Sequence, residues 1–218
     1  MTALLLVSEF ILYGCGGFAL EMGEFLREGG ADRVSDVIDA SGGRHDELCA
    51  ILGYAPALHR RPASVASRAD KQLLICLGDA ALRAQRHAEL AADGFAFGTF
   101  VHRTAWLASS AVIGAGSIIA PFAYVGPHTR IGDNCLVNVH ASVTHDVTLG
   151  AHCVICPQAD LNGGSSCGEA AFIGAGAIVD PGCHVGAGAR IGSGAVVKRG
   201  IAAGALAYGN PAREHAAA

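Results

Sequence analysis

Bulky aliphatic residues recur at every sixth position over nearly half of the chain. Between residues 101 and 197, sixteen of the seventeen positions in this series are Val, Leu or Ile, and the exception is Cys167. Four residues after these positions, from Ser117 to Ala195, a second series holds small residues, with the single exception of Val147. Gly, Asn, Asp and Pro fall between the two series and permit tight corners. The period predicts a three-sided parallel β-helix in which three six-residue segments form one 18-residue coil and both series face inward.

Seventeen six-residue segments make about 5.7 coils, so the expected prism is about 27 Å long at the usual spacing of neighbouring strands. The ends of such a prism need cover, because unpaired strand edges invite association with other chains. The N-terminal part of the chain and the tail after Val197 are candidates for that role.

The first hundred residues follow a different pattern, typical of alternating strands and helices. The segment EFILYGCGGFALEMGEFLREGG reads as an apolar strand, a glycine turn and a helix with one apolar face that stops at Gly29-Gly30. Gly14, Gly16 and Ala19 match the G-x-G-x-x-G/A spacing, and Asp39 follows about 20 residues later, at the end of a second strand. Three interpretations are open: a purely structural tight turn, a turn whose N–H groups hold the phosphate of a nucleotide, or a dinucleotide-binding site, for which a domain of this size is small.

A later strand in QLLICLG and a helix in DAALRAQRHAELAA complete an expected Rossmann-like α/β domain. The sequence therefore predicts two domains, an α/β domain over residues 1–100 and an all-β domain, the parallel β-helix with its C-terminal tail, over residues 101–218.

Charge and composition narrow the possible partners. The formal net charge is -4, and the 15 Lys and Arg residues form no basic stripe, so nucleic acid is not an expected partner. The apolar opening MTALLLVSEFILYG has no basic residue before Arg27, and its apolar runs are too short to span a bilayer. We therefore expect a cytoplasmic protein without a secretory signal or a membrane segment.

The cysteines fit the packing of the prism better than a metal site. Cys153 and Cys156 form an isolated C-x-x-C pair, whereas a zinc site needs four converging ligands. Cys135, Cys153 and Cys183 occupy the small inward position, where Cys acts as a compact apolar residue. Cys135 and Cys153 are expected to stack, but a disulfide is not expected in a reducing compartment.

Several motifs together resemble a known family. The repeat is similar to that of the hexapeptide-repeat left-handed β-helix proteins, and its combination with a small Rossmann-like domain resembles the sugar N- or O-acyltransferases of the PglD/NeuD group. The motifs that carry this resemblance are, in chain order, GCGGFALE, CLGDAALR, VHRTAWL, LVNVHASVTHDVTLG, FIGAGAIVDPG and GNPAR. The resemblance covers nearly the whole chain. It implies that the first domain binds a nucleotide-linked sugar and that the β-helix binds acetyl-CoA.

The repeat also places the candidate catalytic residues. His145 and Asp146 come two and three residues after the inward Val143, where the chain leaves one wall of the prism for the next. Acetyl transfer from a thioester to an amine needs an unprotonated nitrogen, and an exposed imidazole is a suitable base. The resemblance implies that His145 is the general base, assisted by Asp146 and Asn138. Gly163 follows His145 by 18 residues and is expected directly above it, where its amide can stabilise negative charge on the thioester oxygen.

The resemblance further implies how the substrates are held. It assigns acetyl-CoA contacts to Ala175, Ser193 and Lys198, and nucleotide contacts to Gly14, Gly16, Gly17 and Asp39. No metal ion is expected. The implied reaction is direct transfer of acetyl to a nucleotide-linked sugar of the 4-amino-4,6-dideoxy type, with both substrates bound at once. Members of the family are homotrimers with sites between adjacent prisms, so the resemblance implies a homotrimer.

Other readings remain open. The acceptor can be a hydroxyl, as in sialic acid O-acetylation, or the prism can be a binding protein without catalysis. His140 and His145 have the H-x4-H spacing of two zinc ligands in the γ-class carbonic anhydrases, but Thr104 stands where that family has its third histidine. Apart from His145, four histidines fall at corner or outward positions of the repeat. They are interpreted as solvent or subunit contacts: His128, His140, His152 and His184.

Overall fold

The computed structural model describes residues 9–29, 33–66 and 70–215, and these divide into two compact units. The first unit contains the residues up to Leu77 together with Arg86–Gly98, and the second contains Gly78–Gln85 together with the residues from Thr99 onward. The helix α3 (Ala80–Ala92) thus contributes to both units. The first eight residues of the apolar opening segment lie outside the described residues. Within the described ranges, no helix has both the length and the apolar character needed to cross a bilayer.

The first unit is an α/β fold built on a four-stranded parallel sheet in the order β3-β2-β1-β4. Its strand β1 is followed by the predicted helix, which buries Met22 and Leu26 and leaves Phe18 and Phe25 half-buried. This is the Rossmann-like arrangement that the sequence predicts. Its elements are β1 (Glu9–Tyr13), α1 (Gly17–Gly29), β2 (Arg33–Ile38), α2 (His45–Leu52), β3 (Ala57–His59), the short 3-10 helix η1 (Pro62–Ser64), β4 (Gln72–Ile75) and part of α3.

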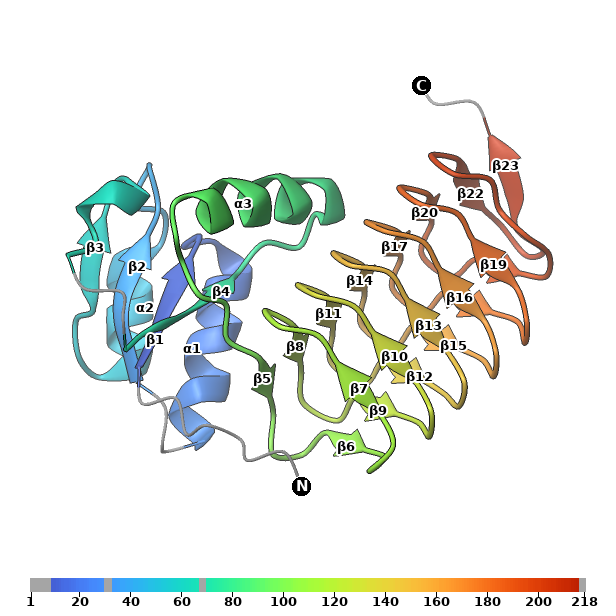
Figure 1. The fold of residues 1–218 in the computed structure, drawn as a ribbon, viewed down its shortest axis with the longest axis horizontal. Helices are drawn as coiled ribbons and strands as arrows, with labels where there is room; N and C mark the ends of the chain where they lie inside the picture. Colours follow the sequence, from blue (N-terminus) through green and yellow to red (C-terminus); the bar gives the residue numbers. More distant parts are fainter. Residues whose placement is uncertain (1–8, 30–32, 67–69, 216–218) are drawn as a thin grey trace. The chain divides into compact units, whose positions relative to one another are not determined.

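The second unit is a left-handed parallel β-helix whose coils follow one another along its axis from β5 to β22 (Figure 1). Its strands are two residues long in all but the last coil, and each pairs in parallel with the strand 18 residues away, as Ile131 does with Leu149. Three sheets form the walls, and the chain visits them in turn. The predicted period and fold are therefore confirmed.

We number the walls in the order in which each coil meets them. The first wall contains β5 (Phe100–Val101), β8 (Ile118–Ile119), β11 (Leu136–Val137), β14 (Val154–Ile155), β17 (Phe172–Ile173), β20 (Arg190–Ile191), β22 (Leu206–Tyr208) and the antiparallel β23 (Arg213–His215). The second wall contains β6 (Trp106–Leu107), β9 (Tyr124–Val125), β12 (Ser142–Val143), β15 (Asp160–Leu161), β18 (Ile178–Val179) and β21 (Val196–Val197). The third wall contains β7 (Val112–Ile113), β10 (Arg130–Ile131), β13 (Thr148–Leu149), β16 (Ser166–Cys167) and β19 (His184–Val185).

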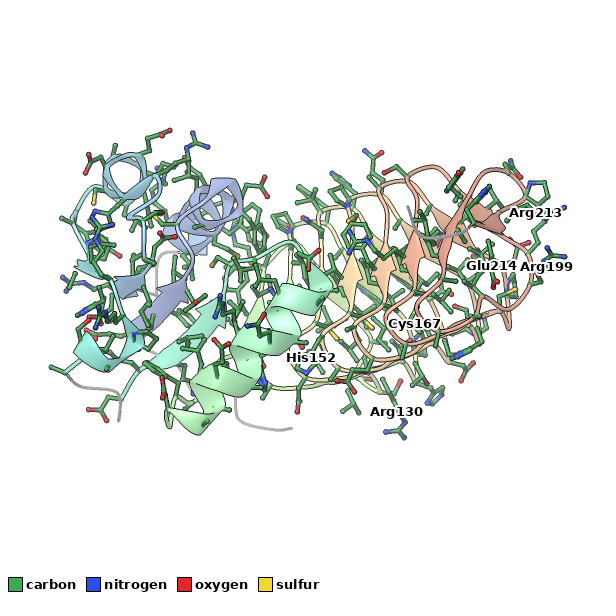
Figure 2. The ribbon with its side chains drawn as sticks, turned by 90° about the horizontal axis from the view of Figure 1, so that it is seen from above. Arg130, His152, Cys167, Arg199, Arg213 and Glu214 are labelled. Atoms are coloured by element: carbon green, nitrogen blue, oxygen red, sulfur yellow. The ribbon has the colours of Figure 1, made fainter. Side chains whose placement is uncertain are left out.

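The second residue of each two-residue strand points inward, and the first faces out. Figure 2 shows this on the third wall, where Cys167 lies inside the β-helix and the Arg130 side chain projects away from it. The small inward series fills the rest of the interior, and Cys135 and Cys153 are completely buried within it. All eight cysteines are free, and burial raises the pKa of the Cys167 thiol to about 12, so it packs as a neutral group.

From Gly116 to Gly194, each corner contains a turn residue with a left-handed backbone, at intervals of six residues. Few residues with side chains adopt this conformation elsewhere in proteins. Here it recurs at eight such positions: Phe122, His128, Asn134, His140, Asp146, His152, Gln158 and Ala170. The turns form three edges. We call them the 1–2 edge, the 2–3 edge and the 3–1 edge after the walls that they join.

A buried arginine from the start of α3 binds the 3–1 edge. Arg83 is fully buried and donates hydrogen bonds to the backbone oxygen and to Oδ1 of Asn134, at 3.0 and 2.8 Å. Asn134 Nδ2 lies 3.0 Å from His152 Nδ1, one coil later. The His152 side chain is only 13% exposed, and burial lowers its pKa, which favours a neutral ring. The interpretation of His152 as a solvent or subunit contact is therefore wrong, because its ring belongs to this internal network.

Candidate active site

The predicted catalytic pair forms the turn between β12 and β13 at the 2–3 edge. His145 Nδ1 lies 2.8 Å from Asp146 Oδ2, and their side chains are 65% and 59% exposed. Because the carboxylate only accepts hydrogen bonds, Nδ1 carries a hydrogen, and in the neutral form of the ring Nε2 then has the free lone pair. The pair is thus an oriented imidazole that can accept a proton at Nε2 on an open surface.

Gly163 lies over the His145 ring, where the sequence placed it. A Cβ atom added to Gly163 would lie 2.5 Å from Nε2 and would overlap the ring. The two turns are joined by the backbone N–H of Gly164, which donates to the carbonyl oxygen of His145 at 3.0 Å. The imidazole of His145 therefore packs directly against the backbone of Gly163, and only glycine leaves room for this contact.

Lys198 belongs to the same edge, three coils after the catalytic pair. It comes directly after β21 of the second wall, at the place in the repeat that Thr144 occupies after β12. Its Nζ lies 3.3 Å from Oδ2 of Asp180, the residue one coil earlier. At the usual strand spacing, three coils correspond to about 14 Å along the edge.

Three other predicted site residues lie at a different edge. Asn138, Ala175 and Ser193 follow β11, β17 and β20 of the first wall, which places all three at the 1–2 edge. Asn138 Oδ1 accepts a hydrogen bond of 2.7 Å from the backbone N–H of Val139. The second wall separates this edge from the 2–3 edge, so one chain does not bring Asn138 to the His145–Asp146 pair.

The predicted nucleotide-binding residues meet in the α/β unit at the carboxyl ends of β1 and β2. Gly14 is buried with a φ of 96°, and a Cβ there would lie 3.2 Å from the carbonyl oxygen of Cys76, so the turn requires glycine. Gly16 and Gly17 are exposed at the start of α1. The three glycines thus lie between the end of a strand and the beginning of a helix, the position that the sequence predicts for them.

Asp39 connects this glycine turn to the loop that follows β2. Its Oδ2 accepts the backbone N–H of Cys15 at 2.8 Å, and its Oδ1 accepts the N–H groups of Ser41 and Gly42, both at 2.9 Å. Burial opposes ionisation of Asp39, but these bonds and the Ser41 hydroxyl together hold its pKa below the usual value. Asp39 is therefore ionised, and its hydrogen bonds hold the loop in place beside the glycine turn.

That loop lines a cavity of about 420 Å³. Its backbone is tied to the glycine turn by the N–H of Arg44, which donates to the carbonyl oxygen of Cys15 at 2.7 Å. The two arginines of this cavity were not predicted from the sequence. The segment SGGRH after Asp39 was the available signal for Arg44, whereas nothing in the pattern indicated Arg60. The lining residues are Ser41, Gly42, Gly43, Arg44, His45, Asp46, Glu47, Leu58 and Arg60.

The H-x4-H spacing does not produce a paired site within the chain. His140 lies in the turn after β11 at the 1–2 edge, whereas His145 lies at the 2–3 edge. In the part of the chain that the structure describes, no three His, Cys, Asp or Glu side chains are arranged to hold a metal ion.

Comparison with known proteins identifies similar sequences and structures. The family model described as bacterial transferase hexapeptide (six repeats) matches residues 110–140, 128–159 and 164–199. No curated protein matches the sequence significantly. PerB from Caulobacter crescentus, solved in complex with CoA and GDP-perosamine, is 31% identical with a TM-score of 0.86, over 96% of this chain and 98% of PerB.

Two further solved structures are similar over their full length. The acetyltransferase domain of PglB from Neisseria gonorrhoeae is 28% identical with a TM-score of 0.85, over 95% of this chain and 99% of that domain. A second structure of the same domain contains acetyl coenzyme A. WeeI from Acinetobacter baumannii is 25% identical with a TM-score of 0.83, over 95% of this chain and 100% of WeeI.

Proposed function

Because this chain belongs to the PglD/NeuD-type sugar acyltransferases and is a sugar N-acetyltransferase, we propose that it acetylates the amine of a nucleotide-linked 4-amino-4,6-dideoxy sugar. Acetyl-CoA is the donor. The observation that carries the proposal is the exposed His145–Asp146 pair with the Gly163 backbone over its ring. PerB, which was solved with CoA and GDP-perosamine, supports the acceptor class.

His145 acts as the general base. Its Nε2 takes a proton from the sugar amine as the nitrogen attacks the thioester carbon, and Asp146 holds the ring through Nδ1 and stabilises its charged form. A C–N bond forms and the C–S bond breaks. The proton then passes from the imidazolium to the departing sulfur, which regenerates the base and balances the reaction.

Gly163 supplies the electrostatic part of the site. In this proposal its backbone N–H points at the carbonyl oxygen of the thioester, on which negative charge develops during attack. The same residue has to be glycine because the His145 ring occupies the space of a side chain. Lys198 extends the donor site toward later coils, where its charge suits the phosphates of the donor.

The remaining donor and catalytic residues require a second copy of the chain. Asn138, Ala175 and Ser193 lie at the 1–2 edge and cannot join the 2–3 edge of the same prism. In a homotrimer in which the 1–2 edge of one protomer faces the 2–3 edge of the next, the residues of the two edges would come together at three equivalent sites. We therefore assign Asn138, Ala175 and Ser193 to the neighbouring protomer of each site.

The nucleotide binds the α/β unit in this proposal. Gly14, Gly16 and Gly17 form the phosphate-binding turn, and Asp39 fixes the loop beside it. Arg44 and Arg60 line the adjacent cavity, whose volume of about 420 Å³ is in the range typical of small-ligand sites. Their guanidinium groups match the charge of a nucleoside diphosphate.

A mass-spectrometric screen tests the activity. The chain is incubated with acetyl-CoA and nucleotide-linked 4-amino sugars, beginning with GDP-perosamine, and in parallel with the corresponding hydroxyl sugars. We expect a gain of one acetyl group on an amino sugar. Acetylation of the hydroxyl sugars alone would favour the O-acetyltransferase reading, and no acetylation of either set would contradict the proposal.

The variant His145→Ala tests the base. We expect turnover to be abolished while acetyl-CoA binding and the oligomeric state remain unchanged, because the side chain is exposed and its loss opens no cavity. The matched control is His184→Ala, an exposed histidine on the third wall whose ring is bonded to the Ser166 hydroxyl. Unchanged turnover in His145→Ala would remove His145 from its role.

A further inference from the structure

His128 lies at the 2–3 edge, one coil before the catalytic pair. It follows β9 and precedes β10, and it occupies the same left-handed turn position as Asp146, with a φ of 60° in both residues. The backbone N–H of Asp146 donates to the carbonyl oxygen of Pro127 at 2.9 Å, so the two turns are directly bonded. The Cα atoms of His128 and Asp146 are therefore about 4.8 Å apart, the spacing of neighbouring strands.

The two turns are in contact along their backbones. A Cβ atom on Gly126 would lie 2.6 Å from the carbonyl carbon of Thr144 and 2.7 Å from the backbone nitrogen of His145. The backbones of the two turns are therefore in direct contact, and the turn of His128 is the next one at this edge toward the earlier coils.

The His128 ring is exposed at this position. Its backbone N–H donates to the Ser110 hydroxyl at 3.1 Å, which fixes the turn, while the ring itself makes no hydrogen bond or ion pair with the residues that the structure describes. The histidines at the equivalent turn position of the other two edges differ. His152 is bonded to Asn134, and the His140 ring stacks on Phe122 at 4.9 Å between centroids.

The direction of the donor decides what His128 meets. In the proposed function, Gly163 and Lys198 hold the donor one and three coils after His145. Direct transfer requires both substrates at once, and the donor fills the edge on the side of the later coils. Along this edge the acceptor therefore extends from His145 toward the earlier coils, where the next exposed polar side chain of the edge is His128.

We propose that His128 is an acceptor-binding residue that orients the amine of the sugar toward His145. An N–H of its imidazole donates a hydrogen bond to an acceptor oxygen about 5 Å from the reacting nitrogen, a distance set by one coil. A hydroxyl of the sugar ring and the phosphate attached to the sugar both place an oxygen at that range. His128 takes no part in the proton transfer. This inference rests on the proposed function, from which it takes the direction of the donor.

Two substitutions at His128 retain the backbone conformation. Ala170 and Gln158 already occupy the same turn position with φ values of 54° and 61°, so His128→Ala and His128→Gln are both compatible with the fold. The alanine variant removes the hydrogen bond donor, and the glutamine variant keeps one at similar reach. His184→Ala again serves as the matched histidine control outside the site.

The test is steady-state kinetics with both substrates varied, using GDP-perosamine or whichever amino sugar the screen identifies. Loss of one hydrogen bond predicts that His128→Ala raises the acceptor KM about tenfold and leaves the acetyl-CoA KM within about twofold. We expect His128→Gln to restore most of the acceptor affinity and His184→Ala to match the wild type. Calorimetric titration of the CoA-bound protein with the same sugar gives the acceptor affinity without relying on turnover.

Inhibition by the free nucleoside diphosphate identifies the oxygen. A parallel rise in its inhibition constant in His128→Ala assigns the bond to the phosphate, and an unchanged constant assigns it to a sugar hydroxyl. An unchanged acceptor affinity in His128→Ala, or an equal loss for both substrates, overturns the inference. The variant His145→Ala tests a different claim. Full activity of His145→Ala would refute the proposed base, but the acceptor affinities of the His128 variants could still be measured and compared.

Discussion

The contact between Gly163 and His145 makes one substitution especially informative. In Gly163→Ala, the new Cβ would lie 2.5 Å from Nε2, so the ring has to move by about 1 Å to reach ordinary van der Waals distance. The ring is the mobile end of an exposed side chain, so it yields without disturbing the coil. A displacement of about 1 Å at a reacting group costs about 100-fold in rate, and we expect kcat to fall by that factor.

The fold is expected to tolerate the same change. Gly163 does not have a left-handed φ, so alanine suits its backbone and should stabilise the chain by up to about 1 kcal/mol through the unfolded state. The contrasting variant is Gly150→Ala, whose Cβ would lie 2.6 Å from the backbone nitrogen of Glu169 and cannot be relieved by a side chain. We expect the midpoint of thermal unfolding to fall for Gly150→Ala and to hold or rise for Gly163→Ala.

Kinetics and calorimetry on the two variants check the reasoning. A Gly163→Ala protein with wild-type kcat would show that the orientation of the His145 ring over Gly163 is not the one used in catalysis. A Gly163→Ala protein with a strongly lowered unfolding midpoint would show that the ring cannot move as described. Either result refutes the argument.

Two further predictions address the catalytic pair and the α/β unit. Asp146→Asn keeps a residue suited to the left-handed turn but replaces the acceptor of the His145 Nδ1 hydrogen, and we expect kcat to fall about tenfold to 100-fold with an unchanged circular dichroism spectrum. Asp36 is buried, which opposes its ionisation, but bonds from Lys71, Ser35 and His59 at 2.6, 2.6 and 2.7 Å lower its pKa overall. Because the folded pKa is below the unfolded value of about 3.9, this stabilisation is present above that pH and is lost as the pH falls through the folded value. Hydrogen exchange of the β1 and β2 amides should therefore accelerate in acid in the wild type. In Asp36→Asn, exchange should already be faster at pH 7, by the equivalent of about 2 kcal/mol, and should depend less on pH. A flat pH profile in the wild type would contradict this.

The β-helix was readable from sequence because each of its contacts repeats. An inward residue such as Val143 packs on residues one coil away that obey the same spacing, so one period fixes strands, register and core together. The stacking of Gly163 on His145 follows from that register alone, since 18 residues separate equivalent positions. The position of the glycine turn in the α/β unit was also predictable, because a buried glycine turn between a strand and a helix has few alternatives.

The parts that the sequence did not reveal depend on where side chains go after a corner. Asn138 and His145 are close in the chain, yet a wall intervenes between their edges. His152 has the same place in the repeat as His140, but Asn134 and the arginine that precedes the β-helix by many residues draw its ring into an internal network. Arg44 precedes α2 and Arg60 follows β3 in the sequence, yet both line the same cavity. No pattern of spacing encodes such meetings.

Because the turns repeat the same backbone conformation, the length of the β-helix sets the distance between residues on one edge. Each additional set of 18 residues lengthens the prism by about 4.8 Å without altering the faces that the residues present. Insertion of one complete set between Gly163 and Lys198 would thus carry the lysine farther from the imidazole while the imidazole kept its own neighbours. The catalytic residues and the distance to Lys198 thus depend on different segments of the chain. Addition or deletion of whole coils can therefore adapt the site to a longer or shorter acyl donor and leave the catalytic residues unchanged.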